Sequence, residues 1–260
     1  MGKFDGILLL SDLDDTFRGK EGTVEEHSRL IRYFTENGGK FGFATGRIAD
    51  YLPKQSFFDL VNAPCCLFNG GLIYDYQAKH TIAYTPVDFT VQEFLNAVDL
   101  KALKCKKMLA SCNADDPTQM VEQDSREPEV LNCRTVKLVF VFENVEDADH
   151  FAETIRVLPL LKNSYVSKSW TVGVEVTSNK ATKGHAFAPI KEYLGSIHTT
   201  VGVGNYYNDI PLLQYADIGI AVDNAPQIVK AAADVIVPSC NSFGFRDVIR
   251  ILEEKVKPTE

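Results

Sequence analysis

The chain has 260 residues, of which 45% are hydrophobic and 24% are charged, a composition that is ordinary for a soluble globular protein. Its net charge of −8 argues against nucleic-acid binding, although a local cation still permits a phosphorylated substrate. No stretch approaches the roughly 20 apolar residues that span a bilayer, and Asp12 breaks the first apolar run, so we expect no signal peptide. We therefore expect a cytoplasmic protein whose partners include neither a membrane nor a nucleic acid.

The six cysteines form no CxxC pair and no Cys/His metal spacing, so we expect reduced thiols. They are Cys65, Cys66, Cys105, Cys112, Cys133 and Cys240.

The first third of the chain alternates between strand and helix signals. The apolar run 7–10 shows no alternation, which predicts a strand buried on both faces, as in a parallel sheet. Helical spacing predicts a helix over 24–37, which the glycines at 38 and 39 end. A strand over 40–44, a helix over 49–61 and a strand over 65–68 follow. This β-α-β-α-β pattern is typical of a parallel sheet with helices on both faces.

The middle of the chain, residues 82–178, has a different character. It holds longer β-like runs at 136–142 and 170–176 and helical stretches at 91–100 and 145–161. A polar segment, 113–129, has the composition of an exposed loop. We interpret residues 82–178 as an α+β domain inserted between two halves of a core, 1–81 and 179–260.

The last third resumes the alternation. We expect helices over 182–194, 211–215, 226–233 and 245–255, and strands over 199–203, 218–221 and 235–237. The predicted fold class is therefore α/β, with a Rossmann-like parallel-sheet core and an inserted α+β domain.

Two carboxylates, Asp12 and Asp14, follow the first predicted strand. Ligands of open α/β sheets bind at the carboxyl ends of the strands, and residues two apart on a strand point the same way. Crowded carboxylates need a bound cation, a shared proton or a nearby Lys or Arg.

Three further polar motifs lie at the ends of predicted core elements. Together the four motifs supply a carboxylate nucleophile, a second acid, a hydroxyl, a cation and further oxygen ligands. That set is typical of phosphoryl transfer through an aspartyl-phosphate with Mg²⁺. Each motif alone is weak, since acidic turns and helix caps are common. The motifs are Asp12-x-Asp14, Thr45-Gly46-Arg47, Lys183-Gly184 and Gly204-Asn205-x-x-Asn208-Asp209.

In these motifs and their order the chain resembles the haloacid dehalogenase superfamily, and within it the Cof-type phosphatases, whose α+β cap is inserted between the second and third motifs. The resemblance implies that Asp12 is the nucleophile and Asp14 the general acid/base. It implies that Lys183 binds phosphate and orders the nucleophile. The other implied phosphate-binding residues are Thr45, Gly46, Arg47 and Asn208.

The resemblance also implies a Mg²⁺ site made of Asp12, the backbone carbonyl of Asp14, Asn205 and Asp209. The sequence departs from the family pattern at two places. Asp15 stands where the family has Gly, a turn position that Asp tolerates. Asn205 stands where the family usually has Asp, and an amide oxygen coordinates a cation without supplying charge. We therefore expect weak metal binding, or a larger share for Asp209.

The implied function is that of a Mg²⁺-dependent phosphatase acting on a small phosphate monoester, such as a sugar phosphate, as a monomer or homodimer. A phosphomutase of the same superfamily remains an alternative. A protein that binds or senses a phosphorylated ligand with little activity is another, because of Asn205. A response-regulator receiver is disfavoured, because it needs about half this length and no inserted domain.

Overall fold

The computed structural model describes residues 2–110, 121–123 and 131–255, and the chain divides into two compact units. The core unit comprises Met1–Arg47, Tyr51–Ala83 and Thr182–Glu260; the inserted unit comprises Ile48–Asp50 and Tyr84–Ala181. The assignment of these units to a catalytic domain and a cap stays a prediction.

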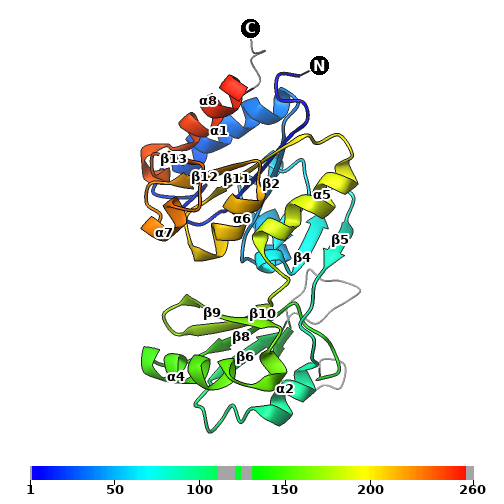
Figure 1. Ribbon diagram of the computed structural model, residues 1–260, viewed down its shortest axis with the longest axis vertical. Coiled ribbons are helices and arrows are strands. Elements are labelled where there is room, and N and C mark those ends of the chain that lie inside the picture. The colour runs from blue at the N-terminus through cyan, green and yellow to red at the C-terminus, as the bar shows by residue number, and fades with distance from the viewer. Residues whose placement is uncertain (1, 111–120, 124–130, 256–260) are drawn as a thin grey trace. The chain divides into compact units, whose positions relative to one another are not determined.

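The core unit is built on the predicted parallel sheet, with strand order β13-β12-β11-β1-β2 (Figure 1). In the register, Ser11 of β1 lies opposite Phe43 of β2 and Val203 of β11. The polar motifs that follow these three strands therefore meet at one edge of the sheet. The strands are β1 (Ile7–Ser11), β2 (Lys40–Phe43), β11 (Thr199–Gly204), β12 (Ile218–Val222) and β13 (Val235–Val237).

Helices cover both faces of this sheet, which explains why β1 is buried throughout and apolar from Ile7 to Leu10 (Figure 1). On one face, Leu8 and Leu10 pack against α5 (Phe187–Leu194) and α6 (Ile210–Tyr215). The other face carries α1 (Thr23–Glu36) and α8 (Phe245–Lys255), where Phe17 contacts the rings of Phe41, Phe43 and Phe245. The short helix α7 (Gln227–Lys230) contacts β12.

Two predictions for the first third are wrong. In place of a helix over 49–61 there are two 3-10 helices, Ala49–Lys54 and Phe58–Leu60, because Pro53 lacks the N–H that an α-helix needs. The third strand, β3 (Cys65–Leu67), touches β2 through one parallel bridge between Ala44 and Cys66. It belongs to a separate sheet with β4 (Leu72–Asp75) and β5 (His80–Tyr84), which the sequence analysis missed.

Several helices are shorter than predicted. The helix expected over 182–194 begins as a 3-10 turn, Lys183–Ala186. The helix expected over 226–233 is α-helical only over Gln227–Lys230. The stretch 145–161 splits into α4 (Val145–Arg156) and a 3-10 turn that begins at Pro159.

The inserted unit is an α+β unit with the antiparallel sheet order β7-β6-β8-β10-β9. Helices α2 (Val91–Ala97) and α4 lie on one face of this sheet, where Phe94, Phe140 and Phe151 form a separate hydrophobic core (Figure 1). The prediction of one continuous β-like run over 170–176 is wrong, because a turn at 171–172 separates two antiparallel strands. Most of the polar segment 113–129 lies outside the described residues. The strands are β6 (Lys107–Ala110), β7 (Val121–Gln123), β8 (Lys137–Val141), β9 (Ser164–Trp170) and β10 (Gly173–Ser178).

Four cysteines, Cys65, Cys66, Cys105 and Cys240, are free thiols as predicted. Cys133 is disulfide-bonded, so the prediction of reduced thiols is wrong there. No helix in the described part of the chain is long and apolar enough to cross a membrane.

His27 is a buried titratable group within the aromatic face of the core. Its Nδ1 lies 2.7 Å from the carbonyl oxygen of Phe17, and its Nε2 has no hydrogen-bond partner among the described residues. Burial lowers the pKa of His27 below its ordinary value of 6.5. Folding therefore disfavours the charged ring, and the stability that the neutral ring contributes is lost as the pH falls below about 6.5.

We expect the wild-type melting temperature to fall between pH 7.5 and pH 5 by more than that of His27→Gln, whose amide does not titrate. Calorimetry at both pH values measures this difference. His150→Gln, at an exposed position, is the matched control and should behave as wild type. An equal loss of stability in His27→Gln and wild type would show that other groups cause the acid sensitivity.

Candidate active site

A buried lysine joins two acids at the carboxyl edge of the parallel sheet. The Nζ of Lys183 donates to Oδ1 of Asp12 at 2.6 Å and to Oδ1 of Asp209 at 2.6 Å. Lys183 is 1% exposed and Asp209 is fully buried. An unpaired charge at this depth is costly, so each of these groups requires the others.

Burial and the nearby Asp209 carboxylate raise the pKa of Asp12 to about 7, against the opposing effect of Lys183. Burial alone would lower the pKa of Lys183, but the two carboxylates hold it above its ordinary value. The lysine therefore stays charged, and additional positive charge beside Asp12 favours its ionised form.

Asp209 also holds the fourth motif in place. Its Oδ2 accepts hydrogen bonds from the backbone N–H groups of Asn205 and Tyr206, both at 2.9 Å. A side chain at Gly204 would collide with Asp209, because its Cβ would lie 2.4 Å from the Cβ of Asp209. Both oxygens of Asp209 are thus occupied by donors, which favours a positioning role; its contribution to a metal site stays a prediction.

The second motif is connected to the fourth through Asn69. The Nδ2 of Asn208 donates to Oδ1 of Asn69 at 3.0 Å, and the Asn69 N–H donates to the Thr45 carbonyl at 3.1 Å. A Cβ at Gly46 would lie 3.0 Å from Asn69 Oδ1, so this part of the second motif packs closely against Asn69. Thr45 is 1% exposed, and its hydroxyl accepts from the Arg47 N–H at 3.1 Å.

The loop after β3 also contacts the third motif. Gly70 has a φ of 108°, and a Cβ there would lie 2.4 Å from the carbonyl oxygen of Thr182. Only glycine fits both the left-handed conformation and this backbone approach. Because Thr182 precedes Lys183 and the Asn69 N–H donates to Thr45, the loop that holds Asn69 and Gly70 contacts both the second and the third motifs.

Asp14 lies between two arginines, one of which the sequence analysis missed. Nε of Arg47 donates to one Asp14 oxygen at 3.0 Å, and a guanidinium nitrogen of Arg18 donates to the other. Arg18 also donates to the hydroxyl of Tyr51 at 2.5 Å. The four-residue spacing between Asp14 and Arg18 was the available signal, but such a spacing is also common in ordinary ion pairs.

Burial raises the pKa of Asp14, but the hydrogen bonds and charges of Arg47 and Arg18 outweigh it and hold that pKa below its ordinary value. Asp14 is therefore ionised at neutral pH in this arrangement. Asp15 has a φ of 58°, so it adopts a left-handed turn conformation, which Asp was expected to tolerate at this position.

The predicted metal ligands are all oxygen atoms, which hard cations prefer. A carboxylate offers about four lone-pair positions, so Asp12 can accept from Lys183 and still coordinate a metal. Asn205, at 8% exposure, the backbone carbonyl of Asp14 and Asp209 are the other predicted oxygen ligands. In the described residues no three His, Cys, Asp or Glu side chains form a metal-binding group. An all-oxygen set with few carboxylates suits Mg²⁺, which retains several waters.

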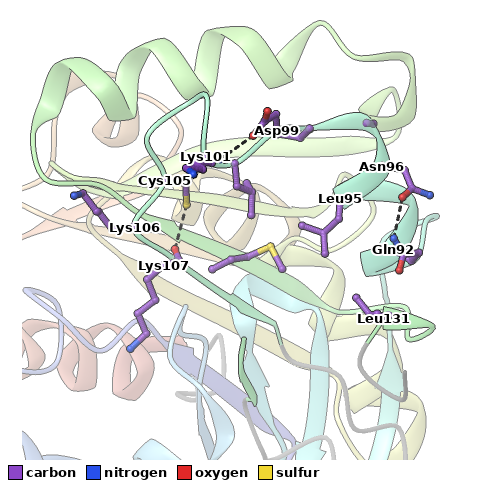
Figure 2. A pocket seen from close by; sticks show the side chains of 13 residues that line it. Gln92, Leu95, Asn96, Asp99, Lys101, Cys105, Lys106, Lys107 and Leu131 are labelled. Carbon is purple, nitrogen blue, oxygen red and sulfur yellow. Dashed lines mark hydrogen bonds between the residues drawn. The ribbon is translucent and has the colours of Figure 1, made fainter. Parts of the chain in front are cut away.

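A cavity of about 920 Å³ lies in the inserted unit, and none of the predicted site residues lines it. Figure 2 shows Leu95 and Leu131 on its wall and the amine of Lys107 at its edge. Because the convergent polar groups lie in the core unit, the candidate site is placed there. The cavity is lined by Gln92, Leu95, Asn96, Ala97, Val98, Asp99, Leu100, Lys101, Cys105, Lys106, Lys107, Met108 and Leu131.

Comparison with known proteins gives the family. Residues 9–249 match the haloacid dehalogenase-like hydrolases, and the chain belongs to this family. A solved haloacid dehalogenase-like hydrolase from Bacteroides thetaiotaomicron has a TM-score of 0.75 at 19% identity, and the match covers 96% of this chain and 99% of that one. The predicted family, fold class and hydrolase activity are thereby confirmed.

Two curated relatives match over nearly their whole length. A phosphoglycolate phosphatase of Methanopyrus kandleri is 26% identical over 96% of this chain and 98% of its own. A pyridoxal phosphate phosphatase of Escherichia coli is 27% identical over 88% of this chain and 92% of its own.

We expect Lys183→Met to destabilise the protein by about 3–5 kcal/mol, because it leaves Asp12 and Asp209 buried without their cation. Urea unfolding measures this loss. Lys104→Met, which removes an exposed lysine that pairs with Asp147, is the matched control and should cost far less. Similar losses in the two variants would contradict the role of Lys183 as the centre of the buried cluster.

Proposed function

We propose that this chain is a Mg²⁺-dependent phosphatase that hydrolyses a small phosphate monoester through an aspartyl-phosphate on Asp12. Hydrolysis of a phosphate monoester agrees with the family of the chain and with its two phosphatase relatives. The observation that carries the proposal is the buried Asp12–Lys183–Asp209 cluster at the carboxyl edge of the sheet.

In the first proposed step, a carboxylate oxygen of Asp12 attacks phosphorus, and the bond from phosphorus to the ester oxygen breaks. Asp14 gives a proton to the departing alkoxide. In the second step, Asp14 takes a proton from a water whose oxygen attacks the aspartyl-phosphate, which releases inorganic phosphate and restores Asp12.

The remaining residues have electrostatic roles in this proposal. Lys183 and the Thr45 hydroxyl hold the phosphate oxygens as charge shifts in the transition state. Thr45 accepts a hydrogen bond from the Arg47 N–H and so keeps its own proton to donate. Asn208 is held at the site by Asn69 and supplies a further amide donor.

Asp14 must carry a proton to act as the acid of the first step. Two arginines keep it ionised in the present arrangement, which suits the base of the second step. To donate a proton in the first step, Asp14 has to lose at least one of these bonds when substrate binds.

Mg²⁺ would be held by Asp12, the Asp14 backbone carbonyl and Asn205, with Asp209 as a further predicted ligand. When bound, it supplies positive charge that offsets the phosphate and the acids around it.

We propose a small phosphorylated metabolite, such as a sugar phosphate, as the substrate. The two relatives act on chemically different esters, a two-carbon acid phosphate and an aromatic aldehyde phosphate, so their names do not select one for this chain. A cytoplasmic location and a monomeric or homodimeric state are part of the same proposal.

We expect the protein to release inorganic phosphate from at least one member of a panel of phosphate esters when Mg²⁺ is present. Asp12→Asn should reduce kcat by about 1,000-fold or more, because it removes the nucleophile. A colorimetric phosphate assay, run with Mg²⁺ and with a chelator, makes the measurement. Activity that is equal in Asp12→Asn and wild type would contradict the mechanism.

Asn205 favours a second candidate function, a protein that binds a phosphorylated ligand with little turnover. If calorimetry shows that the protein binds a phosphate ester and no phosphate is released at millimolar Mg²⁺, the result favours this ligand-binding function.

A phosphomutase would instead transfer the phosphoryl group to a second sugar hydroxyl in the presence of a bisphosphate activator. Chromatography of the products distinguishes a phosphomutase from a phosphatase.

We expect Asn205→Asp to tighten Mg²⁺ binding on the order of tenfold, because a carboxylate adds charge to the ligand set. The metal concentration that produces half of the thermal stabilisation measures the affinity without relying on turnover. Asn241→Asp, at an exposed position of the 3-10 helix Cys240–Ser242, keeps an oxygen for the Lys20 N–H and is the control for a general effect of added negative charge. Equal Mg²⁺ affinities in Asn205→Asp and wild type would rule out Asn205 as a ligand.

A further inference from the structure

Arg18 and Arg47 form a pair of cations beside the candidate active site. Each donates to a different oxygen of Asp14, and both lie against Tyr51. The guanidinium carbons of Arg47 and Arg18 are 4.7 Å and 5.8 Å from the centre of the Tyr51 ring. These cation–π contacts and the Tyr51 hydroxyl hold the two guanidinium groups close together, although like charges repel.

The backbone, rather than a flexible side chain, places Arg18 there. The N–H of Arg18 donates to the Leu13 carbonyl at 2.8 Å, and its own carbonyl accepts from the Asp15 N–H at 2.8 Å. Leu13 and Phe17 anchor this turn, since both are fully buried. Arg18 is thus brought next to Asp14 by the same turn that follows the proposed nucleophile.

The group carries excess positive charge and is accessible to a ligand. Two guanidinium groups face one carboxylate, which leaves one positive charge without a matching acid within the group. The side chains of Arg18 and Arg47 are 32% and 46% exposed. A planar, bidentate guanidinium of this kind recognises carboxylate and phosphate groups well.

We propose that Arg18, together with Arg47, binds a second anionic group of the substrate, a carboxylate or a second phosphate. This inference rests on the proposed phosphatase function and narrows its substrate class. Asp14 follows Asp12 by two residues, a backbone span of at most about 7 Å. The subsite therefore lies in the same neighbourhood as the proposed nucleophile, where a second group of the same small substrate can reach it.

Two matched ligand pairs test this subsite and separate the two kinds of anion. One pair is 3-phosphoglycerate and glycerol 3-phosphate, which differ in a carboxylate. The other is fructose 1,6-bisphosphate and fructose 6-phosphate, which differ in a phosphate. Both kcat/KM in wild type and binding by calorimetry to Asp12→Asn, where turnover is blocked, are compared within each pair.

We expect a preference for the more anionic member of at least one pair. Arg18→Gln should reduce that preference by about 10- to 100-fold, the effect of losing a charged hydrogen bond. Arg18 also bonds to Asp14, so its loss can change the activity toward both ligands of a pair. The ratio of kcat/KM values, or of affinities, between the two ligands cancels this shared effect. Arg18→Lys should restore part of the preference, and Arg32→Gln, which removes an exposed arginine paired with Asp59, should leave it unchanged.

The subsite is overturned if wild type shows no preference, or if Arg18→Gln weakens both members of each pair equally. If the preference appears in binding but no ester is hydrolysed, the proposed phosphatase function fails while the subsite stands. If esters are hydrolysed without any preference, the function stands and the subsite fails.

Discussion

The structure of the site depends on one buried ion cluster, in which Lys183 bonds to both Asp12 and Asp209. Lys183 holds Asp12 at the end of β1. Asp209 holds the loop after β11 through hydrogen bonds from two backbone amides. The loop that holds Asn69 and Gly70 then connects this arrangement to the second motif. The four motifs thus form a single network, and the burial of its charges makes each member necessary to the others.

Much of the core was predictable because its signals are local. The uninterrupted apolar run of β1 and the helical spacing of α1 lead directly to a parallel sheet with its polar motifs at one edge. The errors arose where tertiary context or Pro overrides the pattern. Pro53 replaced a helix by two short 3-10 helices, and β3 joined a separate sheet because β4 pairs with it along its whole length.

The candidate site was predictable as a set of residues but not as a set of contacts. The sequence pattern identified Asp12 and Lys183, yet only the fold shows that Lys183 bonds to two acids at once. The sequence pattern also failed to reveal Arg18, since an arginine four residues after an acid is an ordinary surface pattern. What distinguishes Arg18 is the second arginine on the same carboxylate and the ring of Tyr51, which come from a different part of the chain.

The separation of 171 residues between Asp12 and Lys183 also has a consequence for biosynthesis. Strand β1 lies between β2 and β11, and β11 is synthesised only after the whole inserted unit. The inserted unit has its own hydrophobic core, built from neighbouring segments, and we expect it to fold first. Until the last third of the chain is synthesised, β1 lacks its partner β11 and Asp12 lacks its cation Lys183, so the nascent chain passes through an interval in which the apolar edge of β1 is open to aggregation.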